Sequence, residues 1–350
     1  MIIPKTRATA FGICAAAILA GCAGPNASSI APAGSGGVGM AQTTTGQRSY
    51  FAGARPLANA PAHAGRFKQW MEPAAKNDRL LYVSDFYANV VQVYRYPAHG
   101  SPPPVGTLTG LTNPQGMCVD KAQNVYIANT GTAQILEYAH GGTTPIATYE
   151  DPNEFPVGCA VNPTNHDVAA GNIFGTSGNG SVTVFHKGTA TTYSDPNVFQ
   201  MFFPAFDPSG NLFIGGLSSS GGVQIDELPA GGSALIELSV KGAALLYPGP
   251  IQWDGTFLAV GSGGQDTSGN ATIYRTKLSH KALTVEQSVE IAGAETAQWY
   301  IKSGAKGIVG ADPLSLSVDT WPYPAGGPYD PRKHLIVTSA GSTVISVGKK

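Results

Sequence analysis

Charged side chains are scarce in this sequence. Asp, Glu, Lys and Arg make up 12% of the 350 residues, against about a quarter in an ordinary globular domain. The formal net charge is −1, and no run of Lys and Arg stands out. Because nucleic-acid binding requires a basic patch, the composition excludes a nucleic-acid partner.

The motifs of the common enzyme classes are also missing. The sequence has no P-loop, no G-x-S-x-G elbow and no C-x-x-C pair, and none of its seven histidines belongs to an H-x-x-x-H pair. The glycine-rich stretches 175–180 and 261–264 fall between expected strands, where no helix could present its N-terminus to a phosphate. Without a catalytic constellation the sequence favours a protein that is not an enzyme, and no cofactor is expected.

Long hydrophobic runs are absent as well. The apolar run 8–20 covers 13 residues and follows Lys5 and Arg7. Such a run is too short to span a membrane as a helix, but a short apolar run after basic residues is typical of a secretory signal.

The next residues, Leu19-Ala20-Gly21-Cys22, resemble the bacterial lipobox. The resemblance implies that residues 1–21 are a lipoprotein signal peptide and that the new N-terminal Cys22 is lipidated; a plain cleaved signal is the alternative. More than one acyl chain would anchor the protein stably to the membrane. Ala rather than Asp at position 23 implies retention in the outer membrane, on a side that the sequence leaves open.

Residues 22–65 are rich in Gly, Ala, Ser and Thr and have little to bury. We interpret them as a flexible tether, and residues 66–350 as the folded domain. The domain is rich in Gly and Pro without a collagen-like period, which suits short strands joined by tight turns.

A repeat runs through this domain. Its markers are Tyr96–Gly100 (YPAHG), Tyr138–Gly142 (YAHGG), Leu228–Gly232 (LPAGG) and Tyr323–Gly327 (YPAGG). The first two are 41 residues apart and the others stand at about double that spacing, with degenerate copies at 182–188 and 272–281. A period of roughly 40 to 50 residues is that of four-stranded propeller blades, so six blades are predicted. Because other copies have Gly in place of His99 and His140, these histidines are expected in exposed turns.

Four of the predicted first strands end in Asp or Asn. These residues are Asp120, Asn162, Asp207 and Asp254, and each is followed by a turn. Short polar side chains at such places cap their own backbone. A ring of metal-binding carboxylates is the alternative, and turn chemistry is favoured.

Pro114–Asp120 with Asn124–Asn129 resembles an NHL-type repeat, and Leu81–Asp85 with Asn89–Tyr94 is similar to its YVTN variant. The resemblance implies an all-β, six-bladed β-propeller of four-stranded antiparallel blades. We expect Leu335–Ser339 to finish the last blade. Thr343–Val347 is then predicted to supply the inner strand that the first blade lacks, which removes two exposed sheet edges.

Cys118 and Cys159 occupy equivalent places in adjacent repeats. An exported compartment permits a disulfide between them. Neighbouring inner strands, however, are expected to lie beyond the Cα separation of about 7 Å that a bridge tolerates. Two buried free cysteines are therefore the favoured interpretation, with the disulfide as a candidate.

The candidate ligand-binding face is one end of the propeller. At this end the second strand of each blade ends and the inner, first strand of each blade begins. Its candidate residues are Asp85, Asn113, Gln115, Asn129, Glu154, Phe155, Gln200, Tyr247, Gln298 and Trp299. Further aromatic residues on this face are Phe86, Tyr87, Phe199, Phe202 and Tyr300. Aromatic anchors are typical of interfaces, but rings wedged between blades as core are the alternative; burial between sheets would refute the surface hypothesis.

Three functions remain open. The favoured one is an envelope-anchored, monomeric lipoprotein that binds a protein or glycan, or acts as a scaffold, through this face. The second is suggested by gluconolactonase-type propellers, which hold one divalent cation at the axis through a Glu, two Asn and an Asp; Glu154 could stand for the Glu. The third is a purely structural envelope protein. Fold similarity cannot decide among them.

Overall fold

The computed structural model describes residues 67–175, 178–263, 270–293, 298–302, 304, 306–312, 316–337 and 341–348. The chain divides into two compact units, residues 1–49 and 50–350, and the described residues belong to the second. The predicted signal peptide (residues 1–21), the lipidated Cys22, the tether 22–65 and residue 66 lie outside the described residues. No helix in the described part is long and apolar enough to cross a membrane.

Short strands dominate the described part of this unit, where they form five hydrogen-bonded sheets. The first sheet has the order β1-β4-β3-β2-β25, from β1 (Trp70–Met71), β2 (Arg79–Asp85), β3 (Val90–Arg95), β4 (Gly106–Leu108) and β25 (Thr343–Val347). The second runs β5 (Pro114–Val119), β6 (Val125–Asn129), β7 (Gln134–Tyr138) and β8 (Pro145–Glu150), and the third β9 (Pro156–Val161), β10 (Val168–Asn172), β11 (Ser181–His186) and β12 (Thr189–Tyr193).

The fourth sheet is an eight-stranded one with the order β13-β14-β15-β16-β20-β19-β18-β17. Its strands are β13 (Val198–Phe206), β14 (Leu212–Ser218), β15 (Val223–Leu228), β16 (Ile236–Lys241), β17 (Tyr247–Trp253), β18 (Leu258–Gly263), β19 (Ala271–Ser279) and β20 (Ala282–Ile291). All its pairs are antiparallel except β16–β20, which is parallel. The last sheet runs β21 (Gln298–Ile301), β22 (Ile308–Asp312), β23 (Ser317–Trp321) and β24 (Leu335–Ile336). Three 3₁₀ turns complete the elements: η1 (Pro73–Asn77), η2 (Thr130–Thr132) and η3 (Pro331–Lys333).

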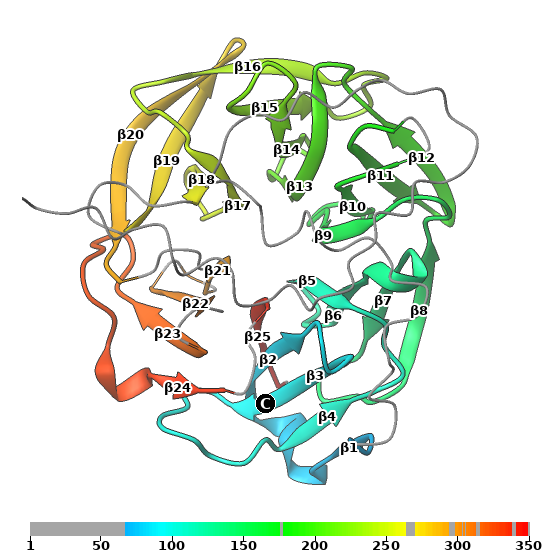
Figure 1. Ribbon diagram of the computed structural model, residues 1–350, viewed down its shortest axis with the longest axis vertical. Coiled ribbons are helices and arrows are strands. Elements are labelled where there is room, and N and C mark those ends of the chain that lie inside the picture. Colours follow the sequence, from blue (N-terminus) through cyan, green and yellow to red (C-terminus); the bar gives the residue numbers. More distant parts are fainter. Residues whose placement is uncertain are drawn as a thin grey trace, which may run out of the picture. The chain divides into compact units, whose positions relative to one another are not determined.

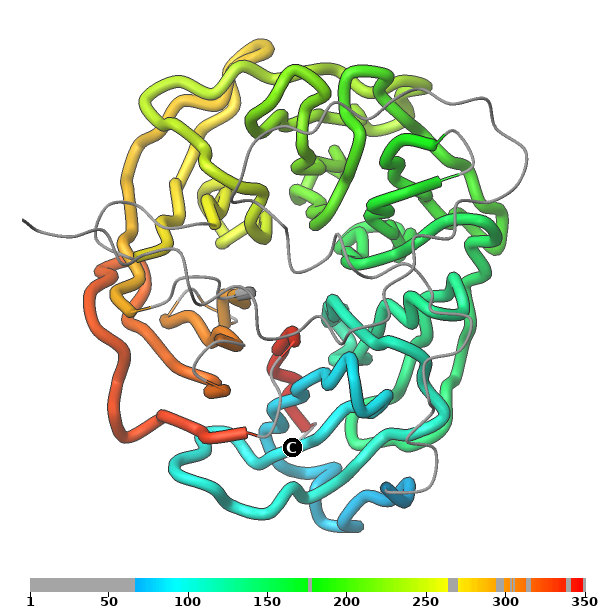
Figure 2. The backbone as a smooth tube through the Cα atoms, in the orientation of Figure 1, coloured from blue at the N-terminus to red at the C-terminus, as the bar shows by residue number. Residues whose placement is uncertain are grey.

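The sheets stand around a common centre, with β5, β9, β13, β17, β21 and β25 innermost (Figure 1). The backbone tube follows this path from blue at the N-terminal side to red at the C-terminus (Figure 2). Consecutive inner strands contact one another, and β25 contacts both β21 and β5, so these strands form a closed ring. The hydrophobic core lies between neighbouring sheets; one cluster joins Leu80 and Tyr82 of β2 to Val125 and Ile127 of β6.

The C-terminal strand β25 completes the first sheet. It pairs antiparallel with β2, from Arg79 opposite Val347 to Val83 opposite Thr343. This confirms the predicted role of Thr343–Val347. The neighbouring sheet also holds the strand, because the Val347 N–H donates to Gln123 Oε1 at 2.9 Å. The preceding β24 is shorter than the predicted Leu335–Ser339, and residues 338–340 lie outside the described part.

The four turn residues act as predicted. Asp120 Oδ1 accepts the Asn124 N–H at 2.7 Å, and Asn162 Oδ1 accepts that of Thr164 at 2.9 Å. Asp207 and Asp254 make the same type of contact with the turns that follow them. Register shifts occur in the inner strands β5, β13 and β17, and in each strand the pairing with its neighbour resumes beyond the shift.

The turn histidines differ from each other. His99 is exposed, as expected. His140 is half-buried and its Nδ1 lies 2.7 Å from Ser346 Oγ on β25, so the expectation of an exposed turn was wrong for this residue. Burial lowers the pKa of His140, which favours the neutral ring in this contact.

Candidate functional site

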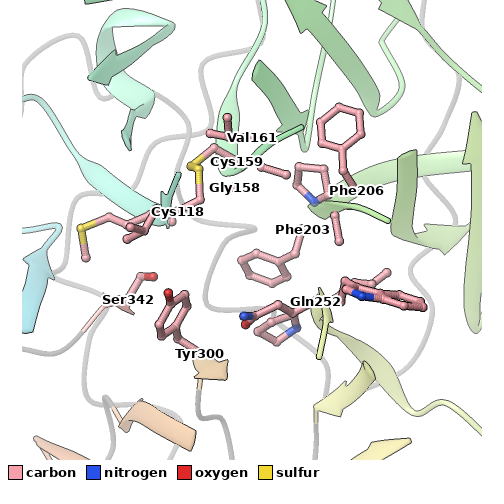
Figure 3. Close-up of a pocket in the computed structure, with 18 of the residues that line it drawn as sticks. Cys118, Gly158, Cys159, Val161, Phe203, Phe206, Gln252, Tyr300 and Ser342 are labelled. Atoms are coloured by element: carbon pink, nitrogen blue, oxygen red, sulfur yellow. A yellow bond between two sulfur atoms is a disulfide. The ribbon is translucent and has the colours of Figure 1, made fainter. Parts of the chain in front are cut away.

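A cavity of about 260 Å³ lies inside the ring of inner strands. All six inner strands or the residues beside them contribute to its wall, and Figure 3 shows side chains from different sheets facing the same space. The larger wall residues are Met117, Val119, Val161, Phe203, Phe206, Ile251, Gln252, Trp253, Trp299 and Tyr300, together with Cys118, Cys159, Ser342 and Thr343. The central cavity is therefore the candidate functional site.

The central cavity offers mainly apolar and aromatic contacts. Among its described lining residues none is Asp, Glu, His, Lys or Arg. The Gln252 amide is already used, because Nε2 donates to Ile301 O at 2.9 Å and Oε1 accepts the Ile301 N–H at 2.8 Å. Burial raises the pKa of Tyr300 to about 12, so its phenol keeps its proton at neutral pH. The site can enclose an apolar ligand, and its hydroxyl-bearing wall residues are Tyr300, Ser342 and Thr343.

The Cys118–Cys159 disulfide forms part of the cavity wall (Figure 3). The two Cα atoms are 5.6 Å apart, so the expectation of two free cysteines on distant strands was wrong. Gly116 on β5 explains the close approach to β9. A Cβ atom on Gly116 would overlap the Val157 carbonyl oxygen and would lie 2.8 Å from Gly158 Cα. Without a side chain at position 116, these two inner strands come within bonding range.

The predicted polar face residues are not gathered in the central cavity. Of the nine candidates whose side chains are described, Trp299 alone lines it. Asn129 and Gln115 are buried. Asn129 Oδ1 accepts the Thr112 N–H at 2.6 Å, and Gln115 Nε2 donates to Thr130 Oγ1 at 2.9 Å. Their amides therefore hold loops of the protein itself.

The other polar candidates also face the protein. Asp85 is buried and caps its own turn by accepting the N–H groups of Tyr87 and Ala88. Asn113 is half-buried, and its Nδ2 donates to Phe86 O at 3.3 Å. Gln200 is buried on β13, and the side chain of Gln298 lies outside the described residues.

The aromatic candidates divide into exposed and packed rings. Tyr87 and Phe199 are exposed, by 72% and 39%. Phe202 and Trp299 are buried, which refutes the surface hypothesis for these two. Phe86, Phe155, Tyr247 and Tyr300 are half-buried; Tyr247, for example, has its ring centroid 5.7 Å from that of Phe202. Most of these rings serve as packing between sheets.

Glu154 lies in a buried polar cluster away from the central cavity. Its Oε2 accepts the Ser181 hydroxyl at 2.5 Å, while Asn172 Nδ2 donates to Ser181 Oγ and to Asp151 Oδ2. Burial raises the pKa of Asp151 to about 6. In the described part of the chain no three His, Cys, Asp or Glu residues are grouped to hold a metal ion. Beside Glu154 the cluster holds one further carboxylate, Asp151, and one amide, Asn172, where the gluconolactonase type has an Asp and two Asn.

Sequence reasoning missed several wall residues of the cavity, although a signal for them exists. The residue immediately before each turn Asp or Asn lines the cavity in all four repeats that have such a turn: Val119, Val161, Phe206 and Trp253. Side chains alternate along a strand, and the turn residue fixes the phase of that alternation. The turn motif could therefore have located these residues.

Comparisons with known proteins identify the fold. No family model matches the chain, and no curated protein sequence matches it. A chain in the crystal structure of a nidogen/laminin complex is similar over 78% of this chain and 99% of its own length, with 13% identity and a TM-score of 0.56. A streptogramin B lyase structure is similar over 65% of this chain and 69% of its own, with 13% identity and a TM-score of 0.45. With its antiparallel sheets around one centre, the chain is an all-β protein with the β-propeller fold.

Proposed function

We propose that this propeller has six blades and works as a binding protein whose ligand occupies the central cavity. The blade count is supported by the parallel β16–β20 seam, which divides the eight-stranded sheet into two antiparallel sets of four, β13–β16 and β17–β20. The remaining sheets each contain one set of four, with β1 added outside β4 in the first.

The ligand class is a small, largely apolar or aromatic molecule with a hydroxyl group. The observation that carries this proposal is the cavity wall, which combines aromatic and aliphatic side chains with the hydroxyl-bearing residues Tyr300, Ser342 and Thr343. Small-molecule sites are typically concave and mostly apolar, with a few placed polar groups. The cavity volume of about 260 Å³ suits a molecule of one or two rings.

A ligand-observed NMR titration with p-cresol and toluene tests this site. Saturation transfer is expected for both probes in the wild type. Val119→Trp, which fills the cavity from β5, should abolish both signals. Tyr300→Phe should weaken the binding of p-cresol by roughly fivefold, because it removes about one neutral hydrogen bond. The same variant should leave the binding of toluene unchanged. Absence of transfer in the wild type, or unchanged transfer in a folded Val119→Trp protein, would refute the cavity as the ligand site.

The proposal places the protein at the bacterial cell envelope, anchored through lipidated Cys22 with residues 22–65 as tether. The lipobox-like tetrapeptide supports the anchor, and a disulfide fits an exported compartment. Under this proposal the propeller is a monomer that binds or scaffolds next to the outer membrane. Metabolic labelling with palmitate tests the anchor: the wild type should take up label and Cys22→Ser should not, whereas equal labelling of both would refute lipidation at Cys22.

A further inference from the structure

A second depression of about 340 Å³ lies between the β9–β12 sheet and β13–β16. We call it the β12 groove, and define it by Asn165, Asp167, His186, Thr191, Tyr193 and Ser209. Only Phe206 lines both the β12 groove and the central cavity. The groove is formed by turns and outer strands rather than by inner strands, so it is a separate site.

One side of the β12 groove carries a preorganised polar triplet. His186 Nδ1 lies 2.7 Å from Asp167 Oδ1, and Asn165 Nδ2 donates to Asp167 Oδ2 at 2.8 Å. The Asp167 N–H in turn donates to Asn165 Oδ1 at 3.0 Å. Both carboxylate oxygens are thus engaged, while the His186 side chain is 55% exposed. With Nδ1 directed at Asp167, the imidazole Nε2 is oriented for a ligand.

The same face of this sheet also carries an aromatic ring and a hydroxyl group, since His186 of β11 pairs with Thr189 of β12. Thr191 and Tyr193 alternate on β12 and so point to the same side of the sheet. The Tyr193 ring is half-buried because it packs against the core cluster of Val182 and Phe206, which fixes its orientation. Thr191 and Ser209 add exposed hydroxyls from different elements.

We propose that the β12 groove binds a neutral oligosaccharide. Sugar hydroxyls both donate and accept hydrogen bonds. The groove presents hydroxyl, amide and imidazole groups, which together can also donate and accept hydrogen bonds. The negative face of an aromatic ring attracts the polarised C–H bonds of a pyranose. No Lys or Arg is among the described lining residues, and its one carboxylate, Asp167, is already paired, so the chemistry favours an uncharged chain. The volume falls within the range of small-molecule sites.

Isothermal titration calorimetry of the whole protein tests the proposal, with cellohexaose, chitohexaose, maltohexaose and laminarihexaose as probes. At least one hexaose is expected to bind the wild type. His186→Ala and Tyr193→Ala should each weaken that binding at least tenfold. Tyr87→Ala is the matched control, because it removes an aromatic ring exposed by 72% far from the groove lining, and it should leave binding unchanged.

Two further measurements keep the result unambiguous. Because Tyr193 is half-buried, thermal melts must show that each variant is folded; Thr191→Val, at an exposed position, is the second groove variant and should weaken binding severalfold. Val119→Trp fills the central cavity and should leave hexaose binding intact. The proposal is overturned if no hexaose binds, if folded His186→Ala binds as tightly as wild type, or if Val119→Trp abolishes binding.

Discussion

Removal of the Cys118–Cys159 disulfide should destabilise the propeller by about 4 kcal/mol at 25 °C, because the bond closes a loop with a sequence separation of 41 residues and so restricts the unfolded chain. The bond also joins β5 to β9, where the backbones already pack closely at Gly116 and Gly158. For a folded unit of about 280 residues, 4 kcal/mol corresponds to a fall in Tm of roughly 6 °C.

The assay compares thermal unfolding of the wild type with that of the Cys118→Ser/Cys159→Ser double variant, with and without a reducing agent. Reduced wild type and the double variant should melt at about the same temperature, below the oxidised wild type. Peptide mapping under non-reducing conditions should yield a Cys118 peptide linked to a Cys159 peptide. The reasoning fails if the oxidised wild type and the double variant melt within about 1 °C of each other while the cross-linked peptide is present.

Three further perturbations test other parts of the structure by thermal unfolding. Deletion of residues 343–350 removes β25 and should abolish the cooperative transition; an unchanged Tm would disprove ring closure by β25. Burial raises the pKa of Asp226 to about 6, above its unfolded value of about 3.9. The contribution of protonated Asp226 to the stability of the folded state is therefore fully present below pH 4, and it is lost as the pH rises through 6. Asp226→Asn should therefore stabilise by about 3 kcal/mol at pH 7.5 but little at pH 4, and a pH-independent effect would contradict this. Asp254→Ala should destabilise by about 3 kcal/mol, because it leaves the largely buried Arg275 guanidinium, 2.7 Å from Asp254 Oδ2, without its carboxylate partner; a loss below about 1 kcal/mol would show that water compensates Arg275.

The repeat and the closing strand could be predicted because they depend on local patterns. Asp120 and Asp207 stabilise turns by accepting hydrogen bonds from nearby backbone N–H groups with their own short side chains. This role can therefore be predicted from the residue type in any copy of the repeat. Thr343–Val347 was left over once every other strand had a place in the sheets. Both inferences needed only order along the chain, and the structure confirms them.

The candidate binding face could not be predicted in the same way. Asn129 and Gln115 have the side chains of a ligand site, but sequence does not reveal that their amides are directed at Thr112 and Thr130. A buried polar group must find a partner within the protein, and that requirement, rather than a ligand, accounts for these amides. These residue types are suited to ligand binding. The direction in which their side-chain amides point, however, depends on loops that only the folded chain brings together.

Non-local pairing explains the other differences. The ordinary spacing of propeller strands places Cys118 and Cys159 too far apart for a bond, whereas Gly116 lacks the side chain that would keep β5 and β9 at that spacing. The parallel pairing of β16 with β20 joins the outer strands of two sets of four strands, β13–β16 and β17–β20. No short sequence pattern encodes such a contact, because neither strand carries a mark that identifies its partner.

Ring closure by β25 has a consequence for the order in which this chain can mature. The partner of β25, β2, is made early, yet the paired residues are separated by roughly 260 positions, so the last strand must find its place across a very long loop. Until residues 343–347 have been synthesised, the edge of β2 with Leu80, Leu81 and Tyr82 has no inner neighbour. A nascent chain truncated anywhere before residue 343 is therefore left with an unpaired strand edge, which can pair with another chain.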